Sequence, residues 1–370
     1  MAGSGFGTIF KITTWGESHG TGIGVVVDGC PAGLTLCEDD IQHFLNRRKP
    51  GQSKFTTPRK ENDTVSILSG VFDGKTTGTP ISMVVWNENQ KSKDYSEIAS
   101  YYRPGHADYP FDAKYGFRDY RGGGRSSGRE TIGRVAAGAI ACKLLNEMGI
   151  SILTYSESIG PVSIDKSRFD TSQIEQNKLY MPDATAALEA EQYLEQCMEE
   201  KNSCGGIIFC EVNGLPVGLG EPVFEKIDAN LAKAMFSIGA VKGFEIGDGF
   251  HVAKSTGLSN NDSFTYNQNC KTIQKATNHS GGTLGGMTDG APLTMRIAIK
   301  PTPSIASLQK TVKKSGEEIS IEIKGRHDPI IVPRAVVVVE SMAALTILDA
   351  LLLNMSSRLD KITKFYSDRN

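Results

Sequence analysis

The sequence predicts an α+β protein of 370 residues that folds as one domain over residues 1–370. Segments with the two-residue periodicity of strands come in groups, and helical segments stand singly between them. This order favours α+β over repeated βαβ units. No repeated, low-complexity or linker-like stretch divides the chain. Hydrophobic residues make up 39% and charged residues 22%, so the chain has the composition of an ordinary globular protein.

Strands are expected where apolar and polar residues alternate, or where a short run is almost wholly apolar. The run at 81–86 is of the second kind, which predicts a buried strand. Of two glycine-rich segments, 237–249 is expected to be a turn or a strand and 278–290 a loop. In chain order, the expected strands cover residues 6–13, 23–27, 65–72, 81–86, 152–162, 205–212, 293–300 and 319–324.

Helices are expected where apolar residues recur at helical spacing. The first has acidic residues in its first turn and Arg47 and Arg48 in its last, as the helix dipole favours. The second contains the small residues 136–139, which would allow close packing against another element. The last is long and apolar. In chain order, the expected helices cover residues 38–48, 130–148, 184–200, 225–236 and 335–353.

Composition argues against several classes of protein. A net charge of −2 does not suit a general nucleic-acid surface, which needs a basic excess. The most apolar stretch, 342–353, is too short to span a bilayer and contains Asp349, and we see no signal peptide. Seven scattered cysteines without a Cys-x-x-Cys pair favour reduced thiols over a disulfide framework or a zinc site. We therefore expect a cytoplasmic protein with no membrane or nucleic-acid partner.

The stretch 121–131 reads RGGGRSSGRET and stands directly before an expected helix. Glycines allow close backbone approach, a helix N-terminus attracts anions, and arginine binds phosphate as a fork. The spacing fits neither the Walker A motif nor the dinucleotide fingerprint. The motif therefore predicts a phosphate cradle of another kind, with a flexible surface loop as the alternative. A second cationic stretch, 47–60, fits anion binding about as well as a solvated charged loop.

Three histidines, His19, His106 and His327, lie in short polar segments flanked by glycine or proline. Histidine titrates near neutrality and can donate or accept a proton, although a lone histidine is more often structural. Asp328 fits either a general base or a salt-bridged turn residue. No spacing of histidine and carboxylate residues suits a metal ion, so no metal is expected.

Six motifs resemble those of the chorismate synthase family. They are GESHG at 16–20, RPGHADY at 103–109, RGGGRSSGRET at 121–131, LGEPVF at 219–224, VKGFEIGDGF at 241–250 and KGRHDP at 324–329. The motifs are long and in order, and the resemblance runs from Lys11 to the closing helix. It implies a β-α-β sandwich with helices packed between antiparallel sheets, assembled as a homotetramer.

The resemblance also implies an activity, the last common step of the shikimate pathway towards aromatic amino acids. The substrate would be 5-enolpyruvylshikimate 3-phosphate, converted to chorismate and phosphate by 1,4-anti-elimination. Reduced FMN would be required without net redox change, because the lost proton is not acidic enough for an unaided side chain. The many cations of the motifs suit a substrate with two carboxylates and a phosphate.

Residue by residue, His19 matches the acid towards the departing phosphate, and His106 matches the residue that protonates or stabilises reduced flavin. Asp328 matches the aspartate that works with the flavin as base. The resemblance places FMN contacts at Arg125, Ser126, Ser127, Gly239, Ala240, Gly285, Lys300, Pro301, Thr302, Pro303, Ser304 and Arg326. It places contacts with the substrate or NADP at Ser18, Arg48, Lys54, Arg103 and Arg129.

Three residues depart from the family pattern. Gly239 stands where many relatives have asparagine, so a side-chain bond to the flavin would be lost. Lys54 replaces an arginine, which exchanges a fork for a point charge, and Pro303 removes a backbone donor. None of the three is one of the expected proton-transfer groups.

Two other functions compete with this interpretation. A flavoprotein oxidoreductase that uses NADPH would share the flavin site, and some members of the family reduce their own flavin. The length of this chain, without large insertions, favours a dependence on an external flavin reductase. A non-catalytic phosphate-binding module would share the arginines and glycines, but pure binding does not require the two histidine segments or Asp328.

Overall fold

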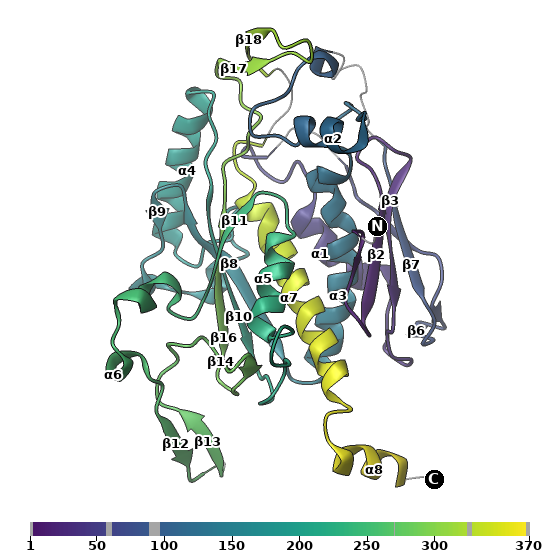
Figure 1. The fold of residues 1–370 in the computed structure, drawn as a ribbon, viewed down its shortest axis with the longest axis vertical. Helices are drawn as coiled ribbons and strands as arrows, with labels where there is room; N and C mark the ends of the chain where they lie inside the picture. Colours follow the sequence, from purple (N-terminus) through teal and green to yellow (C-terminus); the bar gives the residue numbers. More distant parts are fainter. Residues whose placement is uncertain (1–2, 57–60, 89–96, 270, 324–327, 368–370) are drawn as a thin grey trace.

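Two five-stranded antiparallel sheets enclose a layer of helices in the computed structural model, which describes residues 3–56, 61–88, 97–269, 271–323 and 328–367 (Figure 1). One cluster of buried side chains joins the inner faces of both sheets to the helices between them. The fold is the expected α+β sandwich of antiparallel sheets around helices. That residues 1–370 form one domain stays a prediction.

The N-terminal sheet has the order β1 (Gly5–Phe6), β2 (Lys11–Gly16), β3 (Gly22–Asp28), β7 (Ile81–Trp86) and β4 (Val65–Ile67). Its register places Ile12 opposite Val27 and Val27 opposite Ile81, a row of fully buried side chains on the inner face. Alternation along β2 sends the intervening side chains to solvent.

Two expected strands of this sheet are interrupted. The strand expected at 6–13 divides into β1 and β2, because the carboxylate of Asp349 accepts the backbone N–H groups of Thr8, Ile9 and Phe10. The strand expected at 65–72 ends with β4, because Gly70 adopts a φ of +82°. After that turn, β5 (Val71–Phe72) pairs with β6 (Lys75–Thr76) instead.

The C-terminal sheet has the order β11 (Val241–Ile246), β16 (Leu293–Ile299), β10 (Gly206–Asn213), β8 (Ser151–Ile159) and β9 (Val162–Ser163). Ile208 of β10 lies between Ser156 of β8 and Ile297 of β16, and all three face the core. The strand expected at 152–162 ends at Ile159, since Gly160 turns the chain with a φ of +53°.

The helical layer contains α1 (Glu38–Arg48), α3 (Thr131–Glu147), α5 (Ile227–Phe236) and α7 (Val332–Asn354) (Figure 1). The expected helix 38–48 is reproduced to the residue. Close packing between α3 and α7 occurs at Gly138, where a Cβ would lie 2.2 Å from the Cβ of Ser341. The small residues of α3 therefore serve the role expected of them.

Helix α7 extends beyond the apolar stretch 342–353, which is expected to be too short to span a bilayer. The helix has 23 residues, so by length and composition alone it is apolar enough to cross a membrane. Its side chains from Val332 to Asp349, apart from Arg334, are buried between the two sheets. It is the central core helix of the sandwich, which explains why it has no polar face.

The remaining elements lie around this sandwich. Helix α4 (Ala184–Glu199) lies outside it beside β9, as the acidic sequence predicts (Figure 1). The others are α2 (Asp108–Tyr115), α6 (Gly257–Asn260), α8 (Leu359–Ser367), β12 (Phe264–Asn267), β13 (Thr272–Lys275), β14 (Thr283–Leu284), β15 (Met287–Thr288), β17 (Gln309–Val312), β18 (Glu318–Ile321) and short 3₁₀ turns such as η3 (Gly124–Ser126) and η4 (Gly128–Glu130).

Candidate active site

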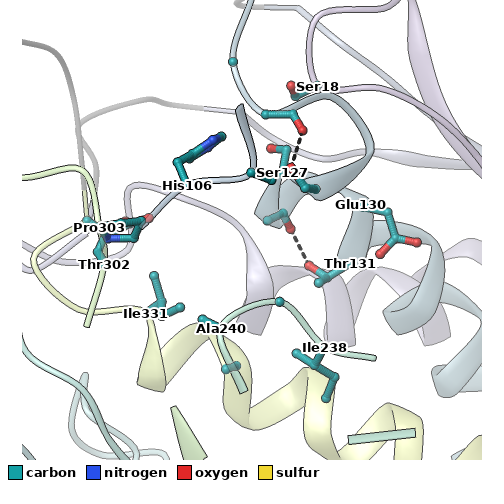
Figure 2. A pocket seen from close by; sticks show the side chains of 18 of the residues that line it. Ser18, His106, Ser127, Glu130, Thr131, Ile238, Ala240, Thr302, Pro303 and Ile331 are labelled. Atoms are coloured by element: carbon teal, nitrogen blue, oxygen red, sulfur yellow. Dashed lines mark hydrogen bonds between the residues drawn. The ribbon is translucent and has the colours of Figure 1, made fainter. Parts of the chain in front are cut away.

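A cavity of about 570 Å³ opens beside the N-terminal ends of α3 and α7. In Figure 2, polar side chains such as Ser18 and Ser127 lie on one side of the space, and the apolar Ile238, Ala240 and Ile331 lie on the other. Segments far apart in the sequence meet here. Of the residues singled out from the sequence, the lining contains Ser18, His19, Arg48, Arg103, His106, Arg125, Ser126, Ser127, Gly239, Ala240, Lys300, Thr302, Pro303, Ser304 and Asp328.

The glycine-rich segment 121–131 enters α3 through the two 3₁₀ turns η3 and η4. Its arginines point in different directions. Arg125 lines the cavity and donates to the carbonyl of Gly16 at 3.1 Å and to Oγ1 of Thr14 at 2.7 Å. Arg129 is buried behind the loop, and Arg121 pairs with Asp119 at the surface. One motif therefore supplies a cavity cation, a buried structural cation and a surface cation.

Arg48, at the end of α1, is a fully buried cation. It forms an ion pair with Asp63, whose other carboxylate oxygen accepts from Arg129 at 3.0 Å. Its Nη1 donates to the carbonyl of Gly128 at 3.2 Å, which ties α1 to the glycine-rich segment. Burial lowers the pKa of the Arg48 guanidinium to about 10 against the opposing pull of Asp63, so the group stays charged at neutral pH.

The second histidine segment is organised by the first residue of α2. Asp108 lies 2.9 Å from Nδ1 of His106 and accepts two bonds from the guanidinium of Arg103, at 2.7 and 2.8 Å. Burial alone would raise the pKa of the Asp108 carboxyl, but hydrogen bonds from Arg103 and His106 outweigh it and hold that pKa well below its usual range. The carboxylate is therefore ionised.

The first histidine segment follows β2. Ser18 and His19 are both buried, and Oγ of Ser18 lies 3.1 Å from Nδ1 of His19. Gly122 lies against the same ring, since a Cβ there would be 2.6 Å from Cε1 of His19. The glycine-rich segment therefore packs directly against the ring of His19, with no room for a side chain at Gly122.

Asp328 lies on the opposite side, just before α7. Its Oδ2 accepts from Arg334 at 2.7 Å, and Nε of Arg334 donates to the carbonyl of Arg48 at 3.0 Å. Asp328 is therefore salt-bridged and also lines the cavity, and its role as a general base stays a prediction. The neighbouring Arg326 and His327 lie outside the described residues.

The segment 300–304 forms another wall. Lys300 donates to the carbonyl of Gly105 at 2.8 Å, and burial with the nearby charge of Lys242 lowers the pKa of its ammonium. Oγ1 of Thr302 is buried without a hydrogen-bond partner within the described parts of the chain. Facing the cavity, Gly239 has nothing within 4 Å of the position that a Cβ would take. A ligand can therefore approach the backbone of Gly239 closely and form a hydrogen bond with Oγ1 of Thr302.

Comparison with known proteins places this site in a family. The model of the chorismate synthase family matches residues 10–352. The chain is 74% identical over 366 residues to the chorismate synthase of Agathobacter rectalis, covering 99% of both chains. It is 68% identical over 366 residues to that of Lachnoclostridium phytofermentans, covering 99% of this chain and 100% of the relative.

A solved structure, described as a crystal structure of chorismate synthase, superposes with a TM-score of 0.75 at 32% identity and covers 98% of each chain. The chain belongs to the chorismate synthase family. It is accordingly an enzyme, a lyase of the shikimate pathway that leads to aromatic compounds.

Among the described residues, four that are expected at the chorismate synthase site do not line the cavity. Lys54 is 58% exposed and pairs with Glu195 of α4. Gly285 lies in the hairpin of β14 and β15, Arg129 is a buried residue of the glycine-rich segment, and Pro301 is exposed between Lys300 and Thr302.

Other residues of the chorismate synthase site escaped the sequence analysis. Arg134 and Arg334 line the cavity, and Asp63 and Asp108 hold its arginines in place. The sequence did contain a signal for Arg134 and Arg334. Each is a lone arginine in the apolar first turn of a helix, α3 or α7, where an unpaired charge would not be buried in a core. Together the lining cations outnumber the lining carboxylates, namely Arg48, Arg103, Arg125, Arg134, Lys300 and Arg334 against Glu130 and Asp328.

Proposed function

We propose that this enzyme converts 5-enolpyruvylshikimate 3-phosphate into chorismate and phosphate by a 1,4-anti-elimination that requires reduced FMN without net redox change. The observation that supports this most is the meeting of His19, His106 and Asp328 in one cation-rich cavity. Proton donors and a carboxylate are needed for an elimination, whereas a purely binding module needs the cations alone.

The charge of the cavity suits the substrate. Three anionic groups on one small molecule need several fixed cations, and arginine provides them in a fork geometry. Arg48, Arg103 and Arg334 are each held by an aspartate or a backbone carbonyl, so they are oriented before a ligand arrives. Such preorganisation lowers the cost of binding.

The other wall suits a flavin. Ala240, Ile238 and Ile331 form an apolar surface on which a flat ring can lie, and the unpartnered Oγ1 of Thr302 offers a hydrogen bond to its polar edge (Figure 2). Gly239 leaves room for close approach of the backbone. The residues that would hold FMN are Arg125, Ser126, Ser127, Gly239, Ala240, Lys300, Thr302, Pro303 and Ser304, with Gly285, Pro301 and Arg326 from the resemblance.

The chemistry is divided between cofactor and protein. FMN held in reduced form by the residues named above would supply electron density for the breaking of the carbon–oxygen bond, with no net oxidation of the flavin. His19 holds a proton for the departing phosphate, and His106 holds one for the flavin. Asp328 accepts the proton that the substrate loses, while Arg334 keeps its carboxylate in place. Ser18, Arg48, Arg103, Arg129 and Lys54 are assigned to the substrate or to NADP.

An anaerobic reaction tests this proposal. The protein is mixed with chemically reduced FMN and 5-enolpyruvylshikimate 3-phosphate, and chorismate absorbance, phosphate release and flavin absorbance are followed together. We expect equal amounts of both products with the flavin still reduced at the end. Stoichiometric oxidation of the flavin, or binding of both ligands without product, would contradict the proposal.

We further infer that reduced flavin comes from an external reductase. Curated relatives of nearly the same length cover this chain from end to end, so it carries no inserted reductase region relative to them. NADPH consumption by the purified protein with FMN alone, at the rate of turnover, would contradict this.

Assembly as a homotetramer in the cytoplasm completes the proposal. Large apolar side chains are exposed on the surface of the described chain, including Phe224, Phe250 and Leu258, and a second copy would cover them. The six cysteines within the described residues are free thiols, in keeping with a reducing compartment. Light scattering of the purified protein should give four times the mass of the chain, and a monomer would overturn the assembly.

A further inference from the structure

The geometry points to Asp108 as a positioning residue that fixes the His106 ring in the tautomer protonated on Nδ1. This leaves Nε2 as the nitrogen that can act on a ligand in the cavity. The use made of His106 rests on the proposed function, but the tautomer is a property of the chain itself. Asp108 was not among the candidates from the sequence, and its side chain is only 4% exposed.

A count of hydrogens assigns the proton on Nδ1. Two groups lie near this nitrogen, Oδ1 of Asp108 at 2.9 Å and Nη2 of Arg103 at 3.1 Å. Nη2 carries two hydrogens. Both have acceptors at shorter distances, namely Oδ1 of Asp108 at 2.7 Å and the carbonyl of Gly122 at 3.0 Å. Nδ1 therefore receives no hydrogen from Arg103, and its contact with the carboxylate is favourable only if Nδ1 is the donor.

The carboxylate is held firmly enough to impose this choice. Oδ2 of Asp108 accepts from Nε of Arg103 at 2.8 Å and from the backbone N–H of Arg103 at 3.0 Å. The depressed pKa of Asp108 keeps it an acceptor only, so it cannot donate to Nδ1. Rotation of the carboxylate would break bonds on both oxygens. The His106 ring is thus oriented by a group that is itself fixed.

The same carboxylate also reaches the other histidine indirectly. Arg103, which Asp108 holds, donates to the carbonyl of Gly122, and Gly122 lies against the His19 ring. Figure 2 shows the His106 ring reaching into the space between Pro303 and Ser127. Asp108 therefore supports His106 directly and the seat of His19 through Arg103.

Nuclear magnetic resonance of the unaltered full-length protein tests the tautomer without any turnover. Histidine labelled with ¹⁵N is observed through two-bond proton–nitrogen correlations, at a pH where the ring is neutral. The His106 signals are identified by their loss in His106→Gln. We expect the pattern of a proton on Nδ1. The pattern of a proton on Nε2 would overturn the inference, whether or not the proposed reaction occurs.

A double-mutant cycle tests whether Asp108 acts through His106. Asp108→Asn keeps the shape but can donate a hydrogen bond, so it permits the other tautomer. We expect kcat to fall by at least ~10-fold, and by no more than the ~10²–10⁴-fold typical of losing a general acid or base outright. In a His106→Gln background the same change should cost almost nothing more. An undiminished loss in that background would mean that Asp108 is merely structural.

The chain offers a matched control on the same helix. Asp112 forms ion pairs with Lys314 at 2.8 Å and with Arg118, and it does not line the cavity. Asp112→Asn removes a comparable charge and should leave kcat unchanged. An equal loss of kcat in Asp112→Asn would contradict the inference, because the loss would then follow from removing any carboxylate of the helix and not from the contact with His106. If Asp108→Asn does not fold, the tautomer measured in the unaltered protein decides the question.

Discussion

Gly122 and His19 are in direct contact: a Cβ on Gly122 would lie 2.6 Å from Cε1 and 2.7 Å from Nδ1 of the ring. The backbone of Gly122 has a φ of +77°, which an L-residue rarely adopts. The glycine therefore serves two needs at once. It allows the turn of the glycine-rich segment 121–131, and it leaves room for the His19 ring.

Gly122→Ala should consequently impair the reaction. The added methyl group must displace the His19 ring, so we expect kcat to fall by ~10²-fold or more, within the range for a misplaced general acid. Gly124→Ala is the control, because Gly124 also has a positive φ of +51° but has nothing within 4 Å of its Cβ position. Equal losses in the two variants would assign the effect to backbone strain instead of the contact. Steady-state assays with reduced FMN measure both.

Asp328→Asn should abolish most turnover while leaving the cavity intact. Asparagine keeps the size and a hydrogen bond to Arg334 but cannot accept a proton, so we expect a loss of ~10²–10⁴-fold in kcat. FMN binding, followed by fluorescence, should change little. Asp119→Asn is the control, since Asp119 pairs with Arg121 outside the cavity. Turnover that survives in Asp328→Asn would remove the base from this position.

The buried pair of arginines around Asp63 predicts a sensitivity to acid. Burial raises the pKa of Asp63, but the charges of Arg48 and Arg129 lower it by more than burial raises it. The pKa of Asp63 in the folded protein therefore lies below its value in the unfolded chain. A depressed pKa contributes stability that is present above about pH 3.9 and lost as the pH falls below it. Asp63→Asn should thus lower the free energy of unfolding by about 3–5 kcal/mol at pH 7, because two buried cations lose their partner.

Urea unfolding between pH 3 and pH 7 measures this effect. The difference between the unaltered protein and Asp63→Asn should be largest at neutral pH and should shrink as Asp63 becomes protonated. If the difference in the free energy of unfolding does not depend on pH, the loss of stability in Asp63→Asn comes from changed packing and not from the lost charge. Asp360→Asn is the control, because Asp360 pairs with Arg358 at the exposed end of the chain.

The contact between α3 and α7 predicts a loss of stability. Gly138→Ala gains up to about 1 kcal/mol of helix propensity. Its new Cβ would lie 2.2 Å from the Cβ of Ser341, and overpacking of this kind costs about 1–3 kcal/mol. We expect a net decrease in the urea midpoint with an unchanged slope. Ser341→Ala, which keeps the Cβ, should have a smaller effect.

Much of this fold could be predicted from local sequence. Helix α1 and strand β7 match their expected bounds, because charges mark both ends of the helix and the strand is apolar except for Ser82. The break between β1 and β2 could not be predicted, since it depends on Asp349, about 340 residues away in the chain. Contacts of that kind leave no periodicity in a sequence.

The site divides in the same way. The roles expected for His19, His106 and Asp328 required the family resemblance and stay predictions, and the structure places all three around one cavity. The spacing of arginines in 121–131 could not show that Arg125 faces the cavity while Arg129 lies behind it, because two short turns set those directions. Asp63 and Asp108 were missed, since a carboxylate that orients a cation can be identified only when the structure shows which cation it contacts.

Helix α7 follows the strands of both sheets in the chain and is therefore synthesised after them, yet both sheets pack against the layer that it completes. Until its final residues emerge, the apolar inner faces of both sheets lack a central element of their core. Folding of this chain is therefore completed after synthesis of nearly all of it, and the nascent protein exposes aggregation-prone surface in the meantime. A chain ending before Val332 would lack the central helix of its core, and we expect it to depend on chaperones without reaching a native state.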